Sequence, residues 1–587
     1  MIRKRLDVSA TAILWVILVL GAHWTAPAAM GQEAIGDTLT VIQRPLQNIP
    51  SLVLMNGEFE ISCSAPANAS QWTAELHHDQ TAVSLEIASA HYAAATTWWT
   101  LTARLPEMSL AELYDLRVTA SGGIDDTVTH AVRVLREFRS EWYFVHITDT
   151  HLPDHRFSDS GAAPEDSTEM DDLREVIRDI NLLNPEFVLL TGDLVNEGEL
   201  EDLWEWRSYT KAQRLLAELE VPLYLVAGNH DIGGWSDTPP VDGTARRNWW
   251  RFFGWPRLAD PPAGASAVTQ DYSFDYGPVH FSGLESYVNY DGWRYPVYGY
   301  ESFVADQLAW LDADLQASTS ADAFVLFYHS DFSDQINLSS LGVDMALSGH
   351  YHSDSGSINS PPFDLKTDNV CDGTRAYRLI RVAGSTLAPR YTMDAGASGQ
   401  NLKVQWLEAN NGTHDSVSAR IVNNQNEAFG NCLLRFCMPV GTQAVQVSGG
   451  TLVQMDPSVA PPVFYVEASV AASSAHLVTV AVDELSPVDP VSIGPQRPAL
   501  TSIYPNPFNP RTRMEFYLPA AGAVELVVFD LKGRVVARLA TGSWMAGAHS
   551  LDWDGKDLDG RALPSGAYFV QLQAGNSVQT RKIVLTR

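Results

Sequence analysis

Five apolar segments of the chain each end abruptly in side chains that can bind metal ions or transfer protons. EWYFVHIT (141 to 148) is followed by DTH, EFVLLT (186 to 191) by GD, and PLYLVA (222 to 227) by GNHD. DAFVLFY (322 to 328) is followed by a histidine, and VDMALS (343 to 348) by GHYH. Carboxylates, imidazoles and an amide, with no thiolate, suit hard to borderline cations such as Mn, Fe or Zn.

These groups require a framework that brings the ends of the segments together. The segments read as strands, and helices are predicted between them, at 171–183, 199–220 and 301–316. A hairpin is predicted through Gly277 and Pro278. Strands that alternate with helices indicate a layered α/β domain, in which sites form beyond the carboxyl ends of the strands. We therefore expect the five junctions to converge.

In this order the blocks resemble the calcineurin-like metallophosphoesterase superfamily, whose pattern is D-x-H, G-D, G-N-H-[DE], H and G-H-x-H. The resemblance covers about 141 to 390 and implies a four-layer α/β/β/α sandwich that holds two divalent or trivalent metal ions (Mn, Fe or Zn). The implied ligands are Asp149, His151 and His352 for the first ion, Asn229, His329 and His350 for the second, and Asp193 as the bridge between them.

The resemblance assigns two further residues to the reaction. His230 would orient or protonate the leaving oxygen, and Asp231 would hold the imidazole of His230 in one tautomer. The implied function is that of a secreted phosphoesterase, in which a hydroxide that bridges the two metal ions attacks a small phosphate ester. The motifs leave open a phosphodiesterase or a phosphomonoesterase, with a slight preference for the diester. A surface binding protein that retains the fold without activity is the alternative from another class.

Some positions near the motifs depart from the pattern or carry weaker signals. Purple acid phosphatases have a tyrosine ligand three residues after the bridging aspartate, but Asn196 stands here, so a tyrosinate-bound ferric ion is not expected. The YHSD segment around His329 lacks the histidine pair common in relatives. His155 and Arg156 are candidate substrate contacts, with solvated loop residues as the alternative.

Composition and the N-terminus indicate an exported protein. The 587 residues include 70 acidic and 39 basic ones, for a net charge of −31, which disfavours nonspecific binding to nucleic acid. Residues 1–31 combine a basic start, an apolar core and small residues, as in a secretory signal peptide, although an uncleaved anchor remains open. No other segment approaches the length of a transmembrane helix. We expect a secreted or surface-attached protein.

The rest of the chain predicts a multidomain α+β protein. Short alternating strands indicate Ig-like β-sandwiches at 33–140 and 396–486, on either side of the metallophosphoesterase domain at 141–395, and a Pro-rich linker follows at 487–500. The cysteine spacing matches no zinc motif, and Cys432 and Cys437 are close enough in sequence for a local disulfide.

The last 87 residues, 501 to 587, carry the blocks PNPFNP and SGAY. They resemble a type IX secretion sorting domain, which is related to the Ig-like domain of flagellar hook-capping proteins. The resemblance implies the type IX secretion machinery as a partner, and export through the periplasm and outer membrane followed by release or surface attachment.

Overall fold

The chain folds into two compact units, Met1–Asp483 and Glu484–Arg587, and each is described by itself. The computed structural model describes residues 41–586 except 95–97, 109, 154–167, 197, 199–207, 233–243, 255–268, 287–301, 397–401, 484–497, 519–520, 546, 559 and 576. The expected signal peptide, most of the linker, and the candidate contacts His155 and Arg156 lie outside the described residues.

The first unit begins with a curved eight-stranded sheet whose strand order is β1-β3-β6-β5-β4-β7-β8-β2. Alternate residues of its strands face one apolar core, as Phe59, Ile61 and Cys63 do in β3. The strands are β1 (Ile42–Arg44), β2 (Ser51–Leu54), β3 (Glu58–Ser64), β4 (Thr73–His78), β5 (Thr81–Ala93), β6 (Trp98–Arg104), β7 (Leu113–Ala120) and β8 (Ile124–Leu135).

Two five-stranded sheets follow, and they carry the five junctions. The first has the order β11-β10-β9-β17-β18 and the second β12-β13-β14-β15-β16. Strands β9, β10 and β11 are parallel, as are β13 to β16, so their carboxyl ends lie along common edges. The strands are β9 (Glu141–Ile147), β10 (Val188–Thr191), β11 (Leu223–Val226), β12 (Tyr272–Tyr276), β13 (Val279–Leu284), β14 (Ala323–Tyr328), β15 (Met345–Ser348), β16 (Phe363–Lys366), β17 (Ala376–Ala383) and β18 (Thr386–Asp394).

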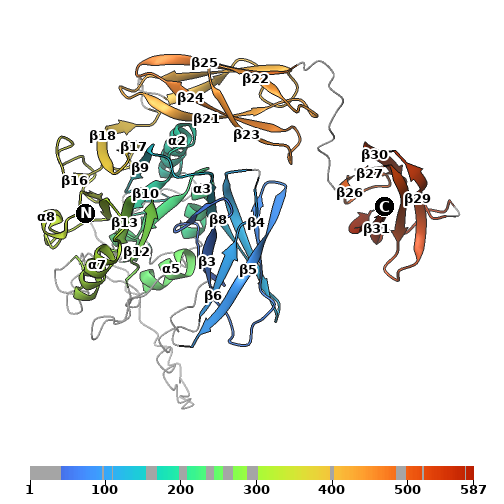
Figure 1. Cartoon of the computed structure of the whole chain (residues 1–587), viewed down its shortest axis with the longest axis horizontal. Helices are drawn as coiled ribbons and strands as arrows, with labels where there is room; N and C mark the ends of the chain where they lie inside the picture. Colours follow the sequence, from blue (N-terminus) through green and yellow to red (C-terminus); the bar gives the residue numbers. More distant parts are fainter. Residues whose placement is uncertain are drawn as a thin grey trace, which may run out of the picture. The chain divides into compact units, whose positions relative to one another are not determined.

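Residue alternation explains how these sheets pack. In β9, Trp142 and Phe144 enter a core shared with the second sheet, whereas Tyr143 and Val145 enter the core that contains α2 and α3. In β14, alternate residues face the first sheet and α7. The helices are α2 (Thr168–Leu183), α3 (Ser208–Leu216), α4 (Asn229–Ile232), α5 (Thr244–Phe253), α7 (Ala305–Ala317) and α8 (Leu338–Leu341) (Figure 1).

Helix α2 shows why the sequence predicts part of this framework well. Leu173, Val176, Ile177 and Ile180 recur at helical spacing, and each is at most 2% exposed. Acidic Glu169 in the first turn favours the amino end of the helix. The helix ends at Leu183, before Pro185, as the sequence predicts.

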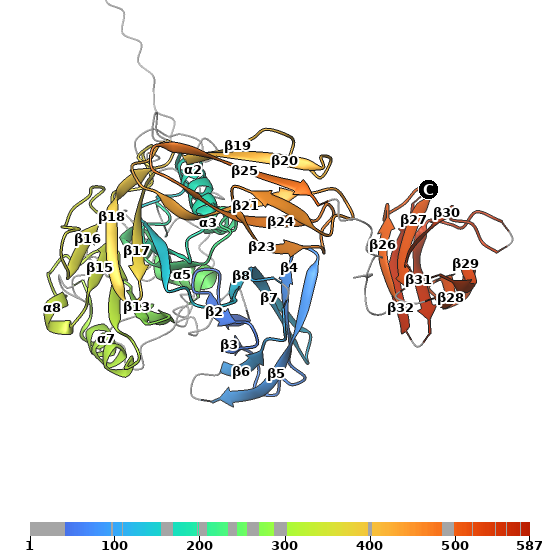
Figure 2. The same cartoon turned by 45° about the horizontal axis from the view of Figure 1, so that its top comes forward.

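The remaining strands of the first unit, β19 to β25, form a β-sandwich that we call the second β-sandwich. It packs against α2 and extends the apolar core that contains α2 and α3 (Figure 2). Its strands are β19 (Leu402–Trp406), β20 (Ser416–Asn423), β21 (Phe429–Cys437), β22 (Val445–Ser448), β23 (Thr451–Asp456), β24 (Val463–Val470) and β25 (Ser474–Val482). Cys432 and Cys437 are both free. They lie five residues apart on the extended strand β21, where side chains alternate between faces, so the local disulfide that the sequence allowed does not form.

The second unit is a β-sandwich of a three-stranded and a four-stranded sheet. Its sequence blocks have structural roles: Phe508 of PNPFNP is buried against Trp553, and the amide of Asn506 bonds the backbone of Lys582 and Val584. The strands are β26 (Ala499–Tyr504), β27 (Thr512–Leu518), β28 (Gly522–Phe529), β29 (Val535–Trp544), β30 (Gly547–Trp553), β31 (Gly566–Ala574) and β32 (Ser577–Leu585). Among the described residues of both units, no helix has the length and apolarity needed to cross a membrane.

A buried histidine makes the stability of the first unit depend on pH. Burial alone would lower the pKa of His280, but Asp275 at 2.7 Å and Asp314 at 3.0 Å outweigh it and raise the pKa to about 9. Since the folded pKa lies above the unfolded value of about 6.5, the stabilisation is complete below pH ~6.5 and is lost as pH rises through about 9.

We expect the free energy of unfolding to fall by roughly 2 kcal/mol between pH ~6.5 and pH ~9. The full pKa shift would give a larger value, but solvent weakens the contact with the exposed Asp275. Urea unfolding of the wild type and of His280→Asn at both pH values measures this fall. The variant should lack this dependence, and an equal decline in both proteins would contradict the assignment.

Candidate metal centre

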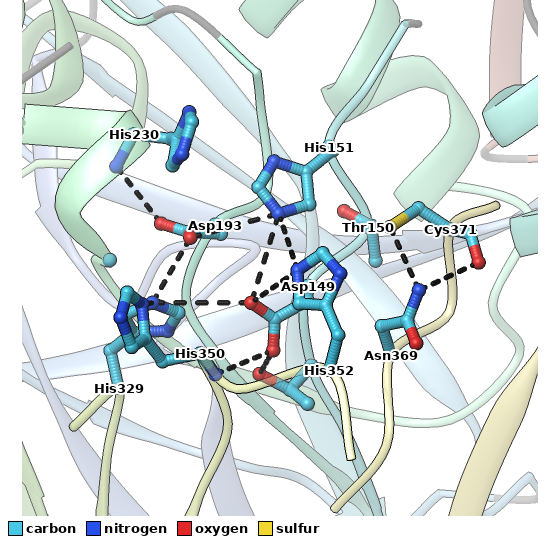
Figure 3. Close-up of polar contacts among 12 residues, drawn as sticks. Asp149, Thr150, His151, Asp193, His230, His329, His350, His352, Asn369 and Cys371 are labelled. Atoms are coloured by element: carbon cyan, nitrogen blue, oxygen red, sulfur yellow. Dashed lines mark hydrogen bonds and ion pairs between the residues drawn. The ribbon is translucent and has the colours of Figure 1, made fainter. Parts of the chain in front are cut away.

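The loops that follow β9, β10, β14 and β15 bring six of the sequence-predicted ligands together in one cluster, which is buried except at the half-buried His350 and His352 (Figure 3). Asn229, in the loop after β11, is buried next to His230, whose amide donates to Asp193. Several of these ligands have a left-handed backbone, which non-glycine residues rarely adopt and which is frequent at functional sites. They are Asp149 (φ 54°), His151 (φ 46°), Asp193 (φ 50°), His350 (φ 73°) and His352 (φ 46°). The chain turns sharply after each strand, and this turn directs the side chain into the cluster.

The first ligand set has the spacing of donors around one ion. Asp149 Oδ1 lies 3.4 Å from His352 Nε2 and 3.8 Å from His151 Nε2, and these two nitrogens are 3.2 Å apart. Bonds of about 2.1 Å to a tetrahedral cation place neighbouring donors ~3.4 Å apart. Asp149 Oδ1 is buried and has no hydrogen-bond partner in the described part of the chain. The set therefore fits a cation.

The second set adjoins the first through Asp193. Its Oδ2 atom lies 3.0 Å from His329 Nε2 and 3.7 Å from His151 Nε2, so it faces both sets. His329 Nε2 lies 3.2 Å from His350 Nδ1. Asn229 is 1% exposed, and within the described residues neither polar atom of its amide has a hydrogen-bond partner. A buried amide without partners is costly, and a cation on its oxygen would offset that cost.

Hydrogen bonds hold the remaining polar atoms and so orient the ligands. Asp149 Oδ2 accepts from the Thr148 hydroxyl at 2.7 Å and from the His350 amide at 2.8 Å. Asp193 Oδ1 accepts from the His230 amide at 2.9 Å. His329 Nδ1 donates to the Thr191 carbonyl at 2.6 Å, which leaves Nε2 facing the centre. Each carboxylate thus keeps one oxygen for the centre.

The electrostatics of the cluster lower the pKa of two ligand imidazoles and raise the pKa of two others. Burial lowers the pKa of His151 to about 4, and burial together with the neighbouring His329 lowers the pKa of His350 to about 4. Burial also opposes a charge on His329, but the carboxylates of Asp193 and Asp149 outweigh it and raise the pKa to about 9. Burial opposes a charge on His352 as well, but its contact with Asp149 outweighs it and raises the pKa. Metals bind neutral imidazoles, so a cation would have to compete with protons at His329 and His352.

His230 lies beside the cluster, but its orientation has a different cause from the one expected. Its ring is edge-on to His151 at 4.7 Å, and Nδ1 donates to the Asn196 carbonyl at 2.5 Å. The carboxylate of Asp231 instead accepts from three backbone amides, those of Gly228, Val195 and Leu194. The expected pairing of Asp231 with His230 is therefore wrong: Asp231 ties two ligand loops together, and a carbonyl fixes the imidazole.

Two glycines of the motifs are required by close packing. A Cβ atom on Gly349 would collide with the Thr148 hydroxyl and the Asp149 carboxylate. A Cβ atom on Gly228 would collide with the carboxylate of Asp193. The glycines in GHYH and GNHD let the backbone approach the carboxylates that they orient.

Cys371 also lies beside the cluster, which the sequence did not indicate. Its sulfur and donor atoms of His151 and His352 lie within 4.8 Å of one another. Figure 3 shows it on the side away from Asp193 and His329. Its amide donates to the Asp149 carbonyl at 3.1 Å, its sulfur accepts from Asn369 at 3.1 Å, and burial raises the pKa of the thiol. No cysteine motif indicates this position, because the loop between β16 and β17 brings Cys371 next to the histidines only in the folded structure.

Comparisons with known proteins agree with this geometry. The family model of calcineurin-like phosphoesterases matches residues 143–354, and that of the FlgD Ig-like domain matches residues 508–577. The chain thus contains a calcineurin-like phosphoesterase domain. Its C-terminal unit contains a FlgD-type Ig-like domain.

Three relatives illustrate the matches. The uncharacterized protein YvnB of Bacillus subtilis is 24% identical over 266 residues, which are 42% of this chain and 18% of YvnB. The basal-body rod modification protein FlgD of Salmonella typhimurium is 41% identical over 56 residues, 10% of this chain and 24% of FlgD. The serine/threonine-protein phosphatase CPPED1 of Bos taurus is 26% identical over 251 residues, 38% of this chain and 72% of CPPED1. The chain thus spans less than a quarter of the length of the first two.

Proposed function

We propose that this chain is a metal-dependent phosphoric ester hydrolase with a dinuclear centre. The observation that carries the proposal is the convergence of two donor sets on Asp193, with a buried Asp149 oxygen and a buried Asn229 amide that lack hydrogen-bond partners among the described residues. Asp149, His151 and His352 would hold one ion, Asn229, His329 and His350 the other, and Asp193 both.

Two cations bound there would supply positive charge for the phosphoryl oxygens and a lowered pKa for bound water. The protein's own residues hold the ligands in fixed orientations and place His230 beside them. Because Nδ1 of His230 donates to the Asn196 carbonyl, Nε2 would be the ring nitrogen that hydrogen-bonds or protonates a leaving oxygen. The chain carries a net charge of −31, which repels an anionic ester, so the bound cations would supply the positive charge that attracts it.

A phosphodiester is the preferred substrate class in this proposal, with a phosphomonoester as the alternative. Turnover of bis-p-nitrophenyl phosphate and p-nitrophenyl phosphate with added Mn²⁺ tests it. We expect hydrolysis of the diester to exceed that of the monoester and to stop when a chelator removes the metal. Absence of turnover of both compounds with Mn²⁺, Fe²⁺ and Zn²⁺ would instead favour a binding protein that retains the fold.

We also propose that the protein is exported and then released or attached to the cell surface. The pattern of residues 1–31 and the PNPFNP and SGAY blocks of the C-terminal unit support a signal peptide and a type IX sorting domain. The two five-stranded sheets pack against each other, and helices pack on the outer face of each sheet. This packing supports the four-layer α/β/β/α arrangement for the catalytic domain. Recovery of the chain outside the outer membrane only when residues 501–587 are present is the test of this export route.

A further inference from the structure

A second cluster of metal-binding side chains lies where the N-terminal sheet meets the second β-sandwich. His78 ends β4, Asp79 lies in the turn between β4 and β5, and Asp456 ends β23. One donor atom from each residue lies within 4.8 Å of the others. Both views of the fold place β4 next to β23 (Figures 1 and 2). The cluster shares no residue with the candidate metal centre.

The imidazole of His78 presents an unsatisfied lone pair to this cluster. Its Nδ1 atom lies 3.2 Å from the Leu113 carbonyl, which can only accept, so Nδ1 carries the proton. The Nε2 atom of a neutral ring is then an acceptor. It is buried and has no hydrogen-bond partner among the described residues. Its neighbour, Asp79 Oδ2 at 3.7 Å, is also an acceptor.

Asp456 contributes a second unsatisfied acceptor. Its side chain belongs to a residue that is only 1% exposed. Oδ1 accepts from the Ser458 amide at 2.8 Å, whereas the buried Oδ2 has no hydrogen-bond partner in the part of the chain that the structure describes. A buried carboxylate oxygen and a buried imidazole nitrogen without a donor in the same cluster are costly, and a cation bound between them would offset that cost.

Other contacts hold the two sides of the cluster in place. The Thr81 hydroxyl donates to the Ser458 hydroxyl at 2.9 Å, next to the three candidate ligands. Farther along the same interface, Gln454 accepts from the Ala111 amide at 3.0 Å and donates to Glu112 at 3.0 Å. The donors therefore keep their positions through protein contacts, as a preorganised ion site requires.

We infer that His78, Asp79 and Asp456 bind a divalent cation that joins the N-terminal sheet to the second β-sandwich. One imidazole nitrogen and two carboxylate oxygens suit Zn²⁺, and the 3.7 Å separation of His78 Nε2 from Asp79 Oδ2 is near the ~3.4 Å expected around a tetrahedral ion. A water molecule completes the tetrahedron. The ion stabilises the interface and takes no part in the proposed hydrolysis.

The zinc content of four proteins tests this site. Wild type, His78→Gln, Asp79→Asn and His77→Gln are loaded with Zn²⁺, freed of loose metal by gel filtration, and measured by elemental analysis. His77 is the matched control because it lies on the opposite face of β4, 3.4 Å from Glu75. Asp79→Asn keeps the fold, since the Asp79 side chain is 60% exposed and asparagine tolerates its φ of 48°.

We expect wild type and His77→Gln to retain one more zinc ion per chain than His78→Gln, and Asp79→Asn to bind that ion at least tenfold more weakly. Zinc should also raise the Tm of the wild type more than that of Asp79→Asn. Equal zinc content in all four proteins, at every zinc concentration, would overturn the inference.

Discussion

Replacement of Asp193 with asparagine is expected to abolish phosphate-ester hydrolysis and to weaken binding of both metal ions. The Asp193 Oδ2 atom lies 3.0 Å from a nitrogen of the second set and 3.7 Å from one of the first. Asparagine keeps an oxygen for the bond from the His230 amide but puts an NH₂ group at the bridging position, which cannot bind a cation. Loss of the bridge should lower kcat/KM by roughly 10³-fold or more, about 4 kcal/mol.

The control for this variant is Asp179→Asn. Asp179 is a buried aspartate on α2, and burial raises its pKa to about 8, so its carboxyl is neutral at pH 7 and asparagine resembles it closely. We expect normal metal content and turnover in this variant. Elemental analysis and steady-state kinetics of both proteins provide the measurement. Full activity in Asp193→Asn would remove the basis for a shared ligand.

Replacement of His230 with glutamine is expected to lower kcat roughly 10²- to 10³-fold while metal content stays unchanged. The imidazole is anchored through Nδ1 to the Asn196 carbonyl and is assigned no metal ion in the proposal, although one of its ring nitrogens lies within 4.8 Å of donor atoms of His151 and Asp193. The loss should be larger for an alkyl phosphate ester than for a p-nitrophenyl ester, because p-nitrophenolate leaves without protonation.

The exposed His414 is the matched site for comparison, and His414→Gln should behave as the wild type. Metal analysis alongside kinetics with the two kinds of leaving group separates the roles. A parallel loss of metal and turnover in His230→Gln would make His230 a ligand. An equal loss for both leaving groups would remove the proton-transfer role.

The sequence predicted the convergence of the histidines and aspartates because these residues follow strands that can be recognised locally. The apolar runs before Asp149, Asp193 and Asn229 are strands β9, β10 and β11, and parallel pairing places their ends at one edge. The helical period of α2 was equally readable. Each of these signals lies within a single strand or helix, where the spacing of apolar residues and the composition indicate the type of element.

The sequence could not predict contacts between segments that are far apart in the chain and meet only in the folded structure. The bond from His230 to Asn196, which replaces the expected role of Asp231, joins two loops. The position of Cys371 beside His151 depends on the path after β16. The pairing of β2 with β8 and the meeting of His78 with Asp456 are likewise nonlocal, and the alternation within one strand does not show which distant strand it meets.

We propose that side chains after five strands hold two metal ions through one shared aspartate. Diffraction from crystals grown with Mn²⁺, measured at the manganese absorption edge, tests it most directly. We expect two anomalous peaks in this cluster, about 3.5 to 4 Å apart. One should lie beside Asp149, His151 and His352 and the other beside Asn229, His329 and His350, with Asp193 between them. A single peak, or two peaks that Asp193 does not join, would contradict it.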